Sequence, residues 1–217
     1  MIDAQHNPIL DGKPPYPLLV VLSGPSGVGK DSILMRMREI GFPFHFVVTA
    51  TSRPIRPGER PGYDYHFVGE ERFREMIVHE ELLEWAEVYG HYKGIPKTEV
   101  REALASGRDV ILRIDVQGAA TIRRIAPEAV FIFVAPGSFD ELTSRLRWRR
   151  TESPDEMERR LGVARQEMAA VEQFDYVVLN HEDRLDDAVG QIRAIIVAEK
   201  QRVRPRRITA GVRSRRS

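Results

Sequence analysis

The chain has 217 residues, of which 42% are hydrophobic and 30% charged, and its formal net charge is +1. This balance is typical of a globular protein and argues against global disorder, because enough apolar surface can be buried to offset the loss of chain entropy. The absence of cysteine excludes disulfide scaffolds and thiol nucleophiles, and the longest compact apolar run, Leu18–Leu22, is far shorter than the roughly 20 residues of a membrane helix.

The two ends of the chain differ in composition from the middle. Residues 1–17 contain four prolines and neither arginine nor serine, so we expect an irregular arm without a transit signal, and a cytoplasmic protein. Residues 201–217 contain seven arginines and no acid. We expect a solvated, disordered basic tail over 204–217, because no aromatic residue there could stack on bases, although the arginines leave nucleic acid open as a partner. The folded body is expected over 18–203.

Short apolar runs alternate with helical patterns along this body. The expected strands are Leu18–Leu22, Phe46–Thr51, Val110–Ile114, Val130–Val134 and Tyr176–Leu179. The expected helices, with apolar residues three and four apart, are Lys30–Ile40, Gln117–Ile125, Phe139–Arg150, Asp155–Gln173 and Leu185–Arg202. The pattern predicts an α/β fold with a parallel sheet covered by helices on both faces.

Residues 53–95 interrupt this alternation. They begin with the turn-rich sequence RPIRPGERPG and continue with a short strand, a helix and an extended segment, which we expect at Tyr65–Val68, Glu70–His79 and Leu83–Val88. We therefore expect a small inserted subdomain.

A glycine-rich loop follows the first strand and opens the first helix. Its residues, which fit the pattern GxxxxGK, are Gly24, Pro25, Ser26, Gly27, Val28, Gly29 and Lys30. In this pattern the glycines let backbone amides turn toward a phosphate, and the lysine brings a charge to the β and γ phosphates. The loop therefore predicts binding of ATP or another nucleoside triphosphate.

The next residue departs from the motif, because a Ser or Thr normally stands there and holds Mg²⁺. Here Asp31 follows the lysine and Ser32 comes next. Either the Asp31 carboxylate or the Ser32 hydroxyl is a candidate Mg²⁺ ligand, although an acid could instead repel the phosphates. Asp115 follows a predicted buried strand and is a candidate to support metal or substrate; the alternative is a helix N-cap ahead of Gln117.

A second anion site is indicated further along the chain. Arg53 and Arg56 lie three residues apart in a segment held open by two prolines, and Tyr65 follows. Two arginines so placed can grip one phosphate, whereas two exposed arginines alone are more often solvated surface. The glycine loop upstream favours the phosphate site, which a kinase needs and an ATPase does not.

In this order the motifs resemble the guanylate kinase family, whose members transfer the γ-phosphate of ATP to GMP. The resemblance runs from about Leu18 to Val197 and rests on the segments GPSGVGK, TSRPIRPGE, DYHFV, ELLEWAEVYG, DVQGA, RLRWRRTES and DYVVLN. It implies a P-loop nucleoside monophosphate kinase fold, with a GMP-binding insertion at about 51–97 and a helical lid at about 147–158. It also implies Mg²⁺ with ATP, GMP or dGMP as acceptor, and a monomer or weak homo-oligomer.

The resemblance further implies roles for individual residues. Positions that read guanine are Thr49, Glu84 and Asp115, and positions that hold the GMP phosphate are Arg53, Arg56 and Tyr65. Lid positions that clamp the transferring group are Arg145, Arg149 and Arg160, while Asn180 falls on the adenine side of ATP. A carboxylate such as Glu84 can accept from guanine N1–H and the exocyclic amine but not pair with adenine N1; otherwise Glu84 is an ordinary exposed acid.

The chain also departs from the family pattern. Lys93 stands where common guanylate kinases have a phosphate-binding tyrosine, Ile95 replaces a hydroxyl near the base, and Arg113 sits where an acid often occurs. These changes resemble a plant-organelle branch of the family, with its GKDS loop and YKGIP stretch. Two alternatives stay open: a sugar-phosphate kinase resembling ribose 1,5-bisphosphate phosphokinase, and a guanylate-kinase-like binding module without activity.

Overall fold

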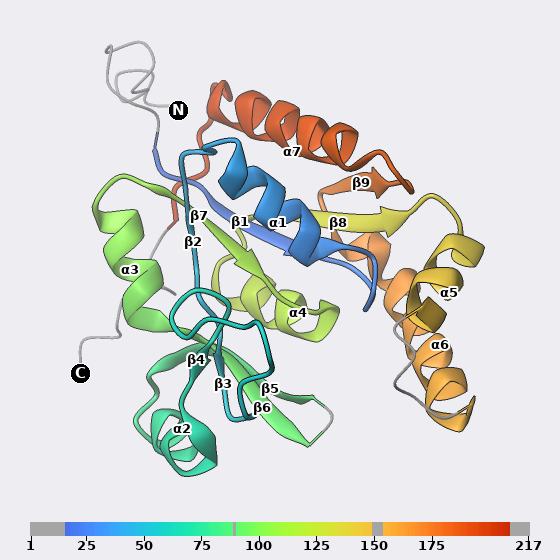
Figure 1. The fold of residues 1–217 in the computed structure, drawn as a ribbon. Coiled ribbons are helices and arrows are strands. Elements are labelled where there is room, and N and C mark those ends of the chain that lie inside the picture. Colours follow the sequence, from blue (N-terminus) through green and yellow to red (C-terminus); the bar gives the residue numbers. More distant parts are fainter. Residues whose placement is uncertain (1–15, 89, 149–153, 209–217) are drawn as a thin grey trace.

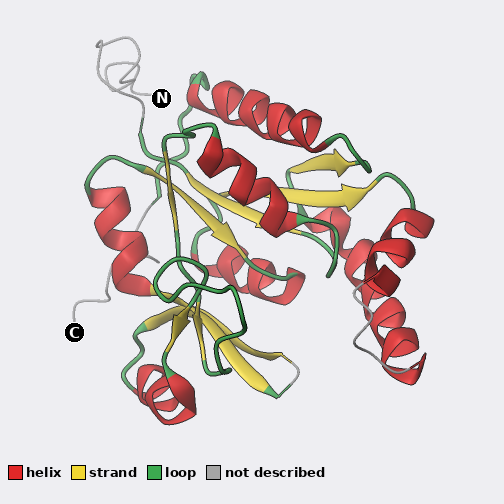
Figure 2. Cartoon of the chain, in the orientation of Figure 1, coloured by secondary structure: helices red, strands yellow, loops and turns green. Residues whose placement is uncertain are grey.

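The computed structural model describes residues 16–88, 90–148 and 154–208, and its strands form two separate sheets (Figures 1 and 2). The larger sheet has the order β2 (Phe44–Phe46), β7 (Asp109–Arg113), β1 (Leu19–Ser23), β8 (Val130–Pro136) and β9 (Tyr176–Asn180). All of its strand pairs are parallel. The expected α/β fold with a parallel sheet is therefore confirmed.

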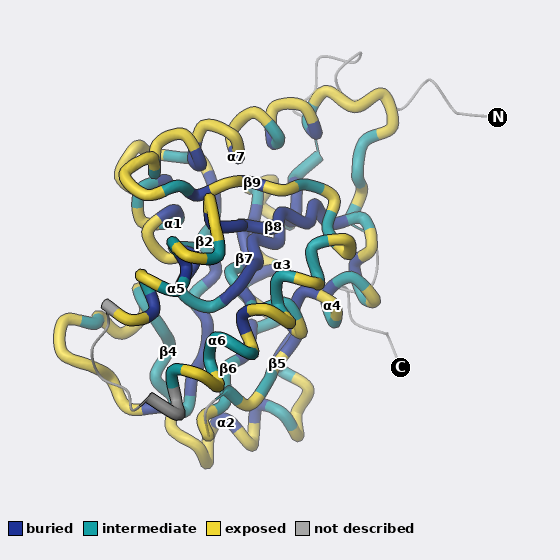
Figure 3. The backbone as a smooth tube through the Cα atoms, turned by 90° about the vertical axis from the view of Figure 1, so that its right-hand side faces the viewer, coloured by how far each residue is buried: buried dark blue, intermediate teal, exposed yellow. Residues whose placement is uncertain are grey.

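Alternate residues of β1 supply two hydrophobic cores, one on each face of this sheet. Val20 and Leu22 face a core shared with α1 (Lys30–Glu39) and α7 (Leu185–Lys200). Leu19 and Val21 face a second core, shared with α3 (Lys97–Ala105) and α4 (Val116–Ile125). Because both faces are covered, every residue of β1 and β8 is buried, and Figure 3 shows β7 and β8 buried.

The smaller sheet lies below the larger one in Figure 1 and forms the inserted subdomain. Its order is β4 (His66–Phe67), β3 (Ala50–Thr51), β6 (His91–Pro96) and β5 (Leu82–Val88). Helix α2 (Gly69–Val78) covers this sheet with the buried side chains of Phe73 and Met76.

Two further helices lie beyond β8, at the right of Figure 1. They are α5 (Phe139–Trp148) and α6 (Pro154–Ala169), and a 3-10 turn at Ala170–Gln173 follows α6. The lid predicted at about 147–158 falls at the junction of these helices, and residues 149–153 lie outside the described residues. Within the described ranges, no helix is long and apolar enough to cross a membrane.

The structure corrects two sequence predictions. The run expected as one strand, Phe46–Thr51, is divided between the sheets, ending β2 and supplying β3. Strand β6 and helix α3 were not expected, because β6 contains Gly94 and Pro96, residues that weaken strand patterns, and α3 is short and highly charged.

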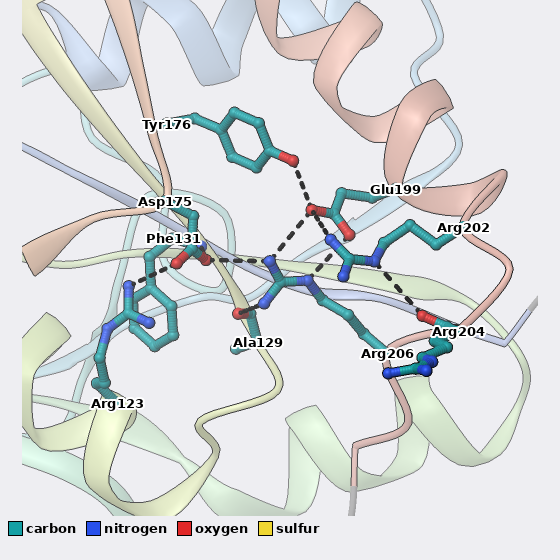
Figure 4. A network of polar contacts seen from close by, with 9 residues as sticks. All are labelled: Arg123, Ala129, Phe131, Asp175, Tyr176, Glu199, Arg202, Arg204 and Arg206. Atoms are coloured by element: carbon teal, nitrogen blue, oxygen red, sulfur yellow. Dashed lines mark hydrogen bonds and ion pairs between the residues drawn. The ribbon is translucent and has the colours of Figure 1, made fainter. Parts of the chain in front are cut away.

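Arg206 belongs to the body of the protein and not to a solvated tail, which corrects the expected start of that tail at 204 (Figure 4). Its guanidinium donates to both carboxylate oxygens of Glu199, at 2.9 and 3.1 Å, and to the backbone oxygen of Ala129 at 2.9 Å. The hydroxyl of Tyr176 also donates to Glu199, at 2.6 Å. Glu199 is 2% exposed, and a carboxylate buried so deeply requires a cation beside it.

Candidate active site

The predicted phosphate loop joins β1 to α1 and has the backbone shape that its glycines allow. Gly24 and Gly29 have φ angles of +139° and +97°. A Cβ added to Gly24 would lie 2.2 Å from the backbone oxygen of Val134, and one added to Gly29 would lie 2.4 Å from Nδ2 of Asn180. The loop is therefore packed so closely against β8 and Asn180 that only glycine fits at both positions.

Lys30 begins α1 and reaches back over the loop. Its ammonium donates to the backbone oxygens of Gly24 and Pro25, at 2.6 and 3.1 Å. Burial lowers the pKa of Lys30 to about 8; Glu167 opposes this shift and Arg113 adds to it. Among the described residues no side chain caps α1, so its first amides face the loop together with this cation. Amides and a cation so placed form an anion-binding site.

Glu167 of α6 also contacts this loop, and the sequence analysis missed it. Its carboxylate accepts a hydrogen bond from the backbone nitrogen of Ser26 at 3.0 Å. Burial raises the pKa of Glu167, and the Ser26 amide and Lys30 oppose that shift. A signal existed in the sequence. Ala164 lies four residues after the predicted lid residue Arg160, and Glu167 lies three residues after Ala164, so the three residues share one face of a helix.

Asn180 and Arg145 hold the outer side of the loop. The side-chain amide of Asn180 donates to the backbone oxygen of Val28 at 2.8 Å. Arg145 donates to that same oxygen at 3.1 Å and to the backbone oxygen of Asn180 at 2.9 Å. Arg160 is partly buried on α6, while Arg149 lies outside the described residues. The structure thus brings Arg145 and Asn180, from α5 and β9, to the loop.

The inserted subdomain presents a second set of cations, grouped around Tyr65. Arg53 is 7% exposed, and its guanidinium bonds both carboxylate oxygens of Glu59, at 2.5 and 2.8 Å. The guanidinium carbon of Arg53 lies 4.8 Å from the centre of the Tyr65 ring. Glu59 was quoted in the sequence motif without a role, and here it is the counterion of Arg53.

Lys93 and Arg56 belong to the same region but differ in burial. The Lys93 ammonium lies 5.9 Å from the centre of the Tyr65 ring. Burial and the charge of Arg53 lower the pKa of Lys93, and burial raises the pKa of Tyr65. Arg56 is exposed, and its backbone nitrogen donates to Glu59 at 2.8 Å. A dianion such as a phosphate monoester fits this cluster, because it would supply the charge that Glu59 supplies in part.

Glu84 is buried on β5 where this strand meets α4. It is 7% exposed, so it is not the ordinary exposed acid of the alternative interpretation. Burial and then the charge of Asp115 raise the pKa of Glu84 to about 8. A Cβ added to Gly118 would lie 2.8 Å from Oε1 of Glu84, so α4 leaves room for this carboxylate. Thr49, also 7% exposed, lies just before β3.

Asp115 is the N-cap of α4, as the alternative interpretation held. Its Oδ1 accepts a hydrogen bond from the backbone nitrogen of Gly118 at 2.8 Å. The charge of Asp115 nevertheless acts on the site, because this charge raises the pKa of Glu84. Ile95 is fully buried in the hydrophobic core shared with α3 and α4, a position that suits an apolar side chain.

The two candidate magnesium ligands are both exposed at the start of α1. The Asp31 carboxylate forms an ion pair with Arg113. In the part of the chain that is described, no cluster of three or more His, Cys, Asp or Glu residues could cage a metal by itself. One carboxylate and one hydroxyl, from Asp31 and Ser32, fit Mg²⁺, which is usually bound through one or two protein groups, phosphates and water.

Comparison with known proteins decides the family. The family model described as guanylate kinase matches residues 16–199. The chain belongs to the guanylate kinase family. It is 51% identical over 196 residues to "Guanylate kinase 2, chloroplastic/mitochondrial" of Oryza sativa subsp. japonica, covering 90% of this chain and 69% of the relative. It is 42% identical to the guanylate kinase of Carboxydothermus hydrogenoformans, covering 90% and 94%.

A solved structure of the same family has the same fold. The guanylate kinase of Anaplasma phagocytophilum is 30% identical to this chain, covers 87% of it over 88% of its own length, and superimposes with a TM-score of 0.70. The family and its P-loop kinase fold, which the motifs predicted, are therefore confirmed.

Proposed function

We propose that this chain transfers the γ-phosphate of ATP to GMP or dGMP, giving ADP and GDP or dGDP. The observation that carries the proposal is the buried Glu84, which lies in the same subdomain as the cations around Tyr65 and has space reserved for it at Gly118. A buried acceptor of hydrogen bonds beside a phosphate site suits a guanine monophosphate, and family membership supports the same substrate.

On the donor side, the loop from Gly24 to Lys30 binds the phosphates of ATP. Its amides and the Lys30 ammonium neutralise charge on the β and γ phosphates. Lys30 must leave the backbone oxygens of Gly24 and Pro25 to do so, and a phosphate offers it a stronger, charged acceptor. Asn180 supports the loop from the adenine side.

On the acceptor side, Arg53, Arg56, Tyr65 and Lys93 hold the phosphate of GMP, and the base is read by Thr49, Glu84 and Asp115. Ionised Glu84 accepts from guanine N1–H and the exocyclic amine. Adenine would leave its own N1 and the carboxylate unpaired in a buried site, and such a mismatch costs orders of magnitude in kcat/KM.

The chemistry asks the protein to align two phosphates, neutralise their charge and exclude water. No general base is needed, since a phosphate monoester is largely dianionic above a second pKa of about 6. Arg145 and Arg160 of the lid helices add positive charge near the transferring group, and Arg149 is assigned the same task from the sequence alone. Mg²⁺ held by Asp31 or Ser32 and the ATP phosphates supplies further charge neutralisation when bound.

The experiment that tests this function measures ADP release with ATP and Mg²⁺. The acceptors are GMP, dGMP, AMP, UMP and ribose 1,5-bisphosphate, and each is assayed with the wild type, with Lys30→Ala and with Arg36→Ala as a surface control. We expect turnover with GMP and dGMP only, abolished in Lys30→Ala and retained in the control.

Other outcomes would replace the proposal. Turnover with the sugar bisphosphate would indicate a sugar-phosphate kinase, and no turnover with any acceptor would indicate a binding module. The cytoplasmic location and the monomeric or weakly oligomeric state stay predictions.

A further inference from the structure

The two departures from the usual motifs, at positions 31 and 113, meet in space. Asp31 lies in the first turn of α1, directly after the phosphate loop, and Arg113 ends β7. Strands β1 and β7 are neighbours in the sheet, with Leu22 opposite Arg113, so both residues lie at the same edge. A side-chain nitrogen of Arg113 donates to Oδ1 of Asp31. Two changes 82 residues apart in the sequence are therefore one ion pair.

Arg113 lies between the donor and acceptor phosphate sites. Its guanidinium carbon is 5.1 Å from the centre of the Tyr65 ring, the same ring that Arg53 and Lys93 approach. On its other side its charge acts on Lys30 of the phosphate loop. A phosphate held at the Tyr65 cluster would have the Arg113 guanidinium on the side that faces ATP.

The pairing of Arg113 with Asp31 repeats the pairing of Arg53 with Glu59. In both, a largely buried guanidinium, with side-chain exposures of 20% and 8%, is held by a more exposed carboxylate, at 68% and 20%. Burial lowers the pKa of Arg113 to about 10, which reflects how poorly its charge is solvated. A cation so placed is best satisfied by an anion buried beside it, and the exposed Asp31 satisfies it only in part.

We propose that Arg113 binds the phosphate of the acceptor nucleotide, and that Asp31 is the counterion which holds Arg113 in the empty enzyme and releases it when that phosphate arrives. This inference rests on the proposed function, because it names one further residue of the same acceptor site. It also makes Asp31 a competitor of the acceptor phosphate.

The competing explanation, a purely structural ion pair, predicts a different pattern of mutant effects. If the pair only stabilises the fold, removing either partner should act in the same direction. If Asp31 competes with the phosphate for Arg113, the two substitutions should have opposite effects on GMP binding. Guanosine, which has no phosphate, should be insensitive to both.

The experiment is calorimetric titration of the full chain with GMP and with guanosine. The variants are Arg113→Ala, Arg113→Lys, Asp31→Asn and the Arg113→Ala/Asp31→Asn double variant. Arg36→Ala is the matched control, because Arg36 pairs with the exposed Asp186 on the surface in a similar Arg–Asp contact. Thermal unfolding of each variant reports whether it is folded.

We expect Arg113→Ala to weaken GMP binding about 10- to 100-fold, the loss of one charge-assisted contact, and to leave guanosine binding unchanged. Arg113→Lys should recover part of that loss. Asp31→Asn should tighten GMP binding about three- to tenfold, and this gain should vanish in the double variant. The control should bind both ligands like the wild type.

Two results would overturn the inference: equal losses for GMP and guanosine in Arg113→Ala, or weaker GMP binding in Asp31→Asn. If Arg113→Ala fails to fold, GMP binding by Asp31→Asn decides alone, because Asp31 is exposed and its substitution is conservative. Failure of the proposed function would look different, since the wild type itself would then bind neither guanosine nor GMP.

Discussion

The proposed donor and acceptor phosphate sites are built from different parts of the chain. The donor loop is shaped by backbone, with glycines at positive φ angles packed against Val134 and Asn180. The proposed acceptor site consists of side chains from β5, β6, β7 and the segment after β3, with its cations grouped around Tyr65.

This difference leads to an expectation about which positions tolerate other residues. A site made of backbone is fixed by the few residues that permit its shape, so its glycines cannot be exchanged. A site made of side chains needs charge and reach, which several residue types supply. In the proposed acceptor site, Lys93 therefore supplies a phosphate contact where the family pattern has a tyrosine, and Arg113 supplies one where an acid often stands.

Substitution of Gly24 should break the donor site and spare the acceptor site. In Gly24→Ala the new Cβ would overlap the backbone oxygen of Val134, and φ would be strained at +139°. We expect kcat/KM for ATP to fall on the order of 1,000-fold, with guanosine affinity unchanged in calorimetry.

The control for this change is Gly107→Ala. Gly107 also has a positive φ of +80°, but an added Cβ would meet no described atom within 4 Å. It should cost about 1 kcal/mol of stability and leave ATP kinetics intact. Equal kinetic losses in both variants would show that strain alone, and not the shape of the loop, is responsible.

Substitution of Glu84 should impair the acceptor site and spare the donor site. Glu84→Gln keeps the size of the side chain but replaces an acceptor with a donor where guanine also donates. We expect kcat/KM for GMP to fall about 100-fold and KM for ATP to change little. Steady-state kinetics with each substrate varied in turn makes the measurement. An unchanged KM for GMP would show that Glu84 does not read the base.

The raised pKa of Glu84, about 8, gives guanosine binding a pH dependence. Guanine needs the ionised carboxylate, so below pH 8 binding must first remove a proton. We expect guanosine affinity to fall as the pH is lowered from 8 to 6, by up to about tenfold per unit, with proton release seen as a dependence on buffer ionisation heat. The affinity of Glu84→Gln should not change over this range.

The raised pKa of Glu84 also makes the free energy of unfolding depend on pH. The folded pKa of Glu84 is above its unfolded value of 4.5, so its contribution to stability is lost as pH rises toward 8. Glu84→Gln should therefore raise the unfolding temperature more at pH 8.5 than at pH 5. A larger gain at pH 5 would contradict this assignment.

We expect the smallest effect from substitution of Glu167, whose side chain contacts the donor loop. Its carboxylate bonds the Ser26 amide and would repel a phosphate bound beside it. Glu167→Gln should tighten ATP binding about three- to tenfold in calorimetry. Weaker ATP binding would show instead that Glu167 supports the loaded loop.

The sequence predicted those parts of the site that lie within one continuous motif. The phosphate loop, Arg53 and Tyr65 belong to local patterns whose chemistry can be read directly. The pairing of Asp31 with Arg113 and the space at Gly118 could not be predicted, because each depends on which elements meet in the folded chain. Glu59 lies in the same motif as Arg53, but the motif alone does not show that the two side chains pair. The helix face that Glu167 shares with Arg160 was a signal, but its contact with the loop depends on the fold.

The fold was predictable to a similar degree. Buried parallel strands produce continuous apolar runs, so β1, β7, β8 and β9 of the larger sheet were expected to within two residues at each end. The run Phe46–Thr51 was misjudged as one strand because apolarity reports burial and not the sheet to which a residue belongs. Strand β6 was missed because Gly94 and Pro96 weaken its strand pattern.

The anchoring of Arg206 sets a limit on how far this chain can be shortened. A truncation ending at residue 208 keeps the guanidinium that neutralises Glu199, whereas one ending at residue 203 removes it and leaves the buried carboxylate with Tyr176 and the more exposed Arg202. Loss of one partner from a buried pair costs about 3–5 kcal/mol. Shortened versions for crystallisation or fusion should therefore retain Arg206, although it belongs to neither proposed phosphate site.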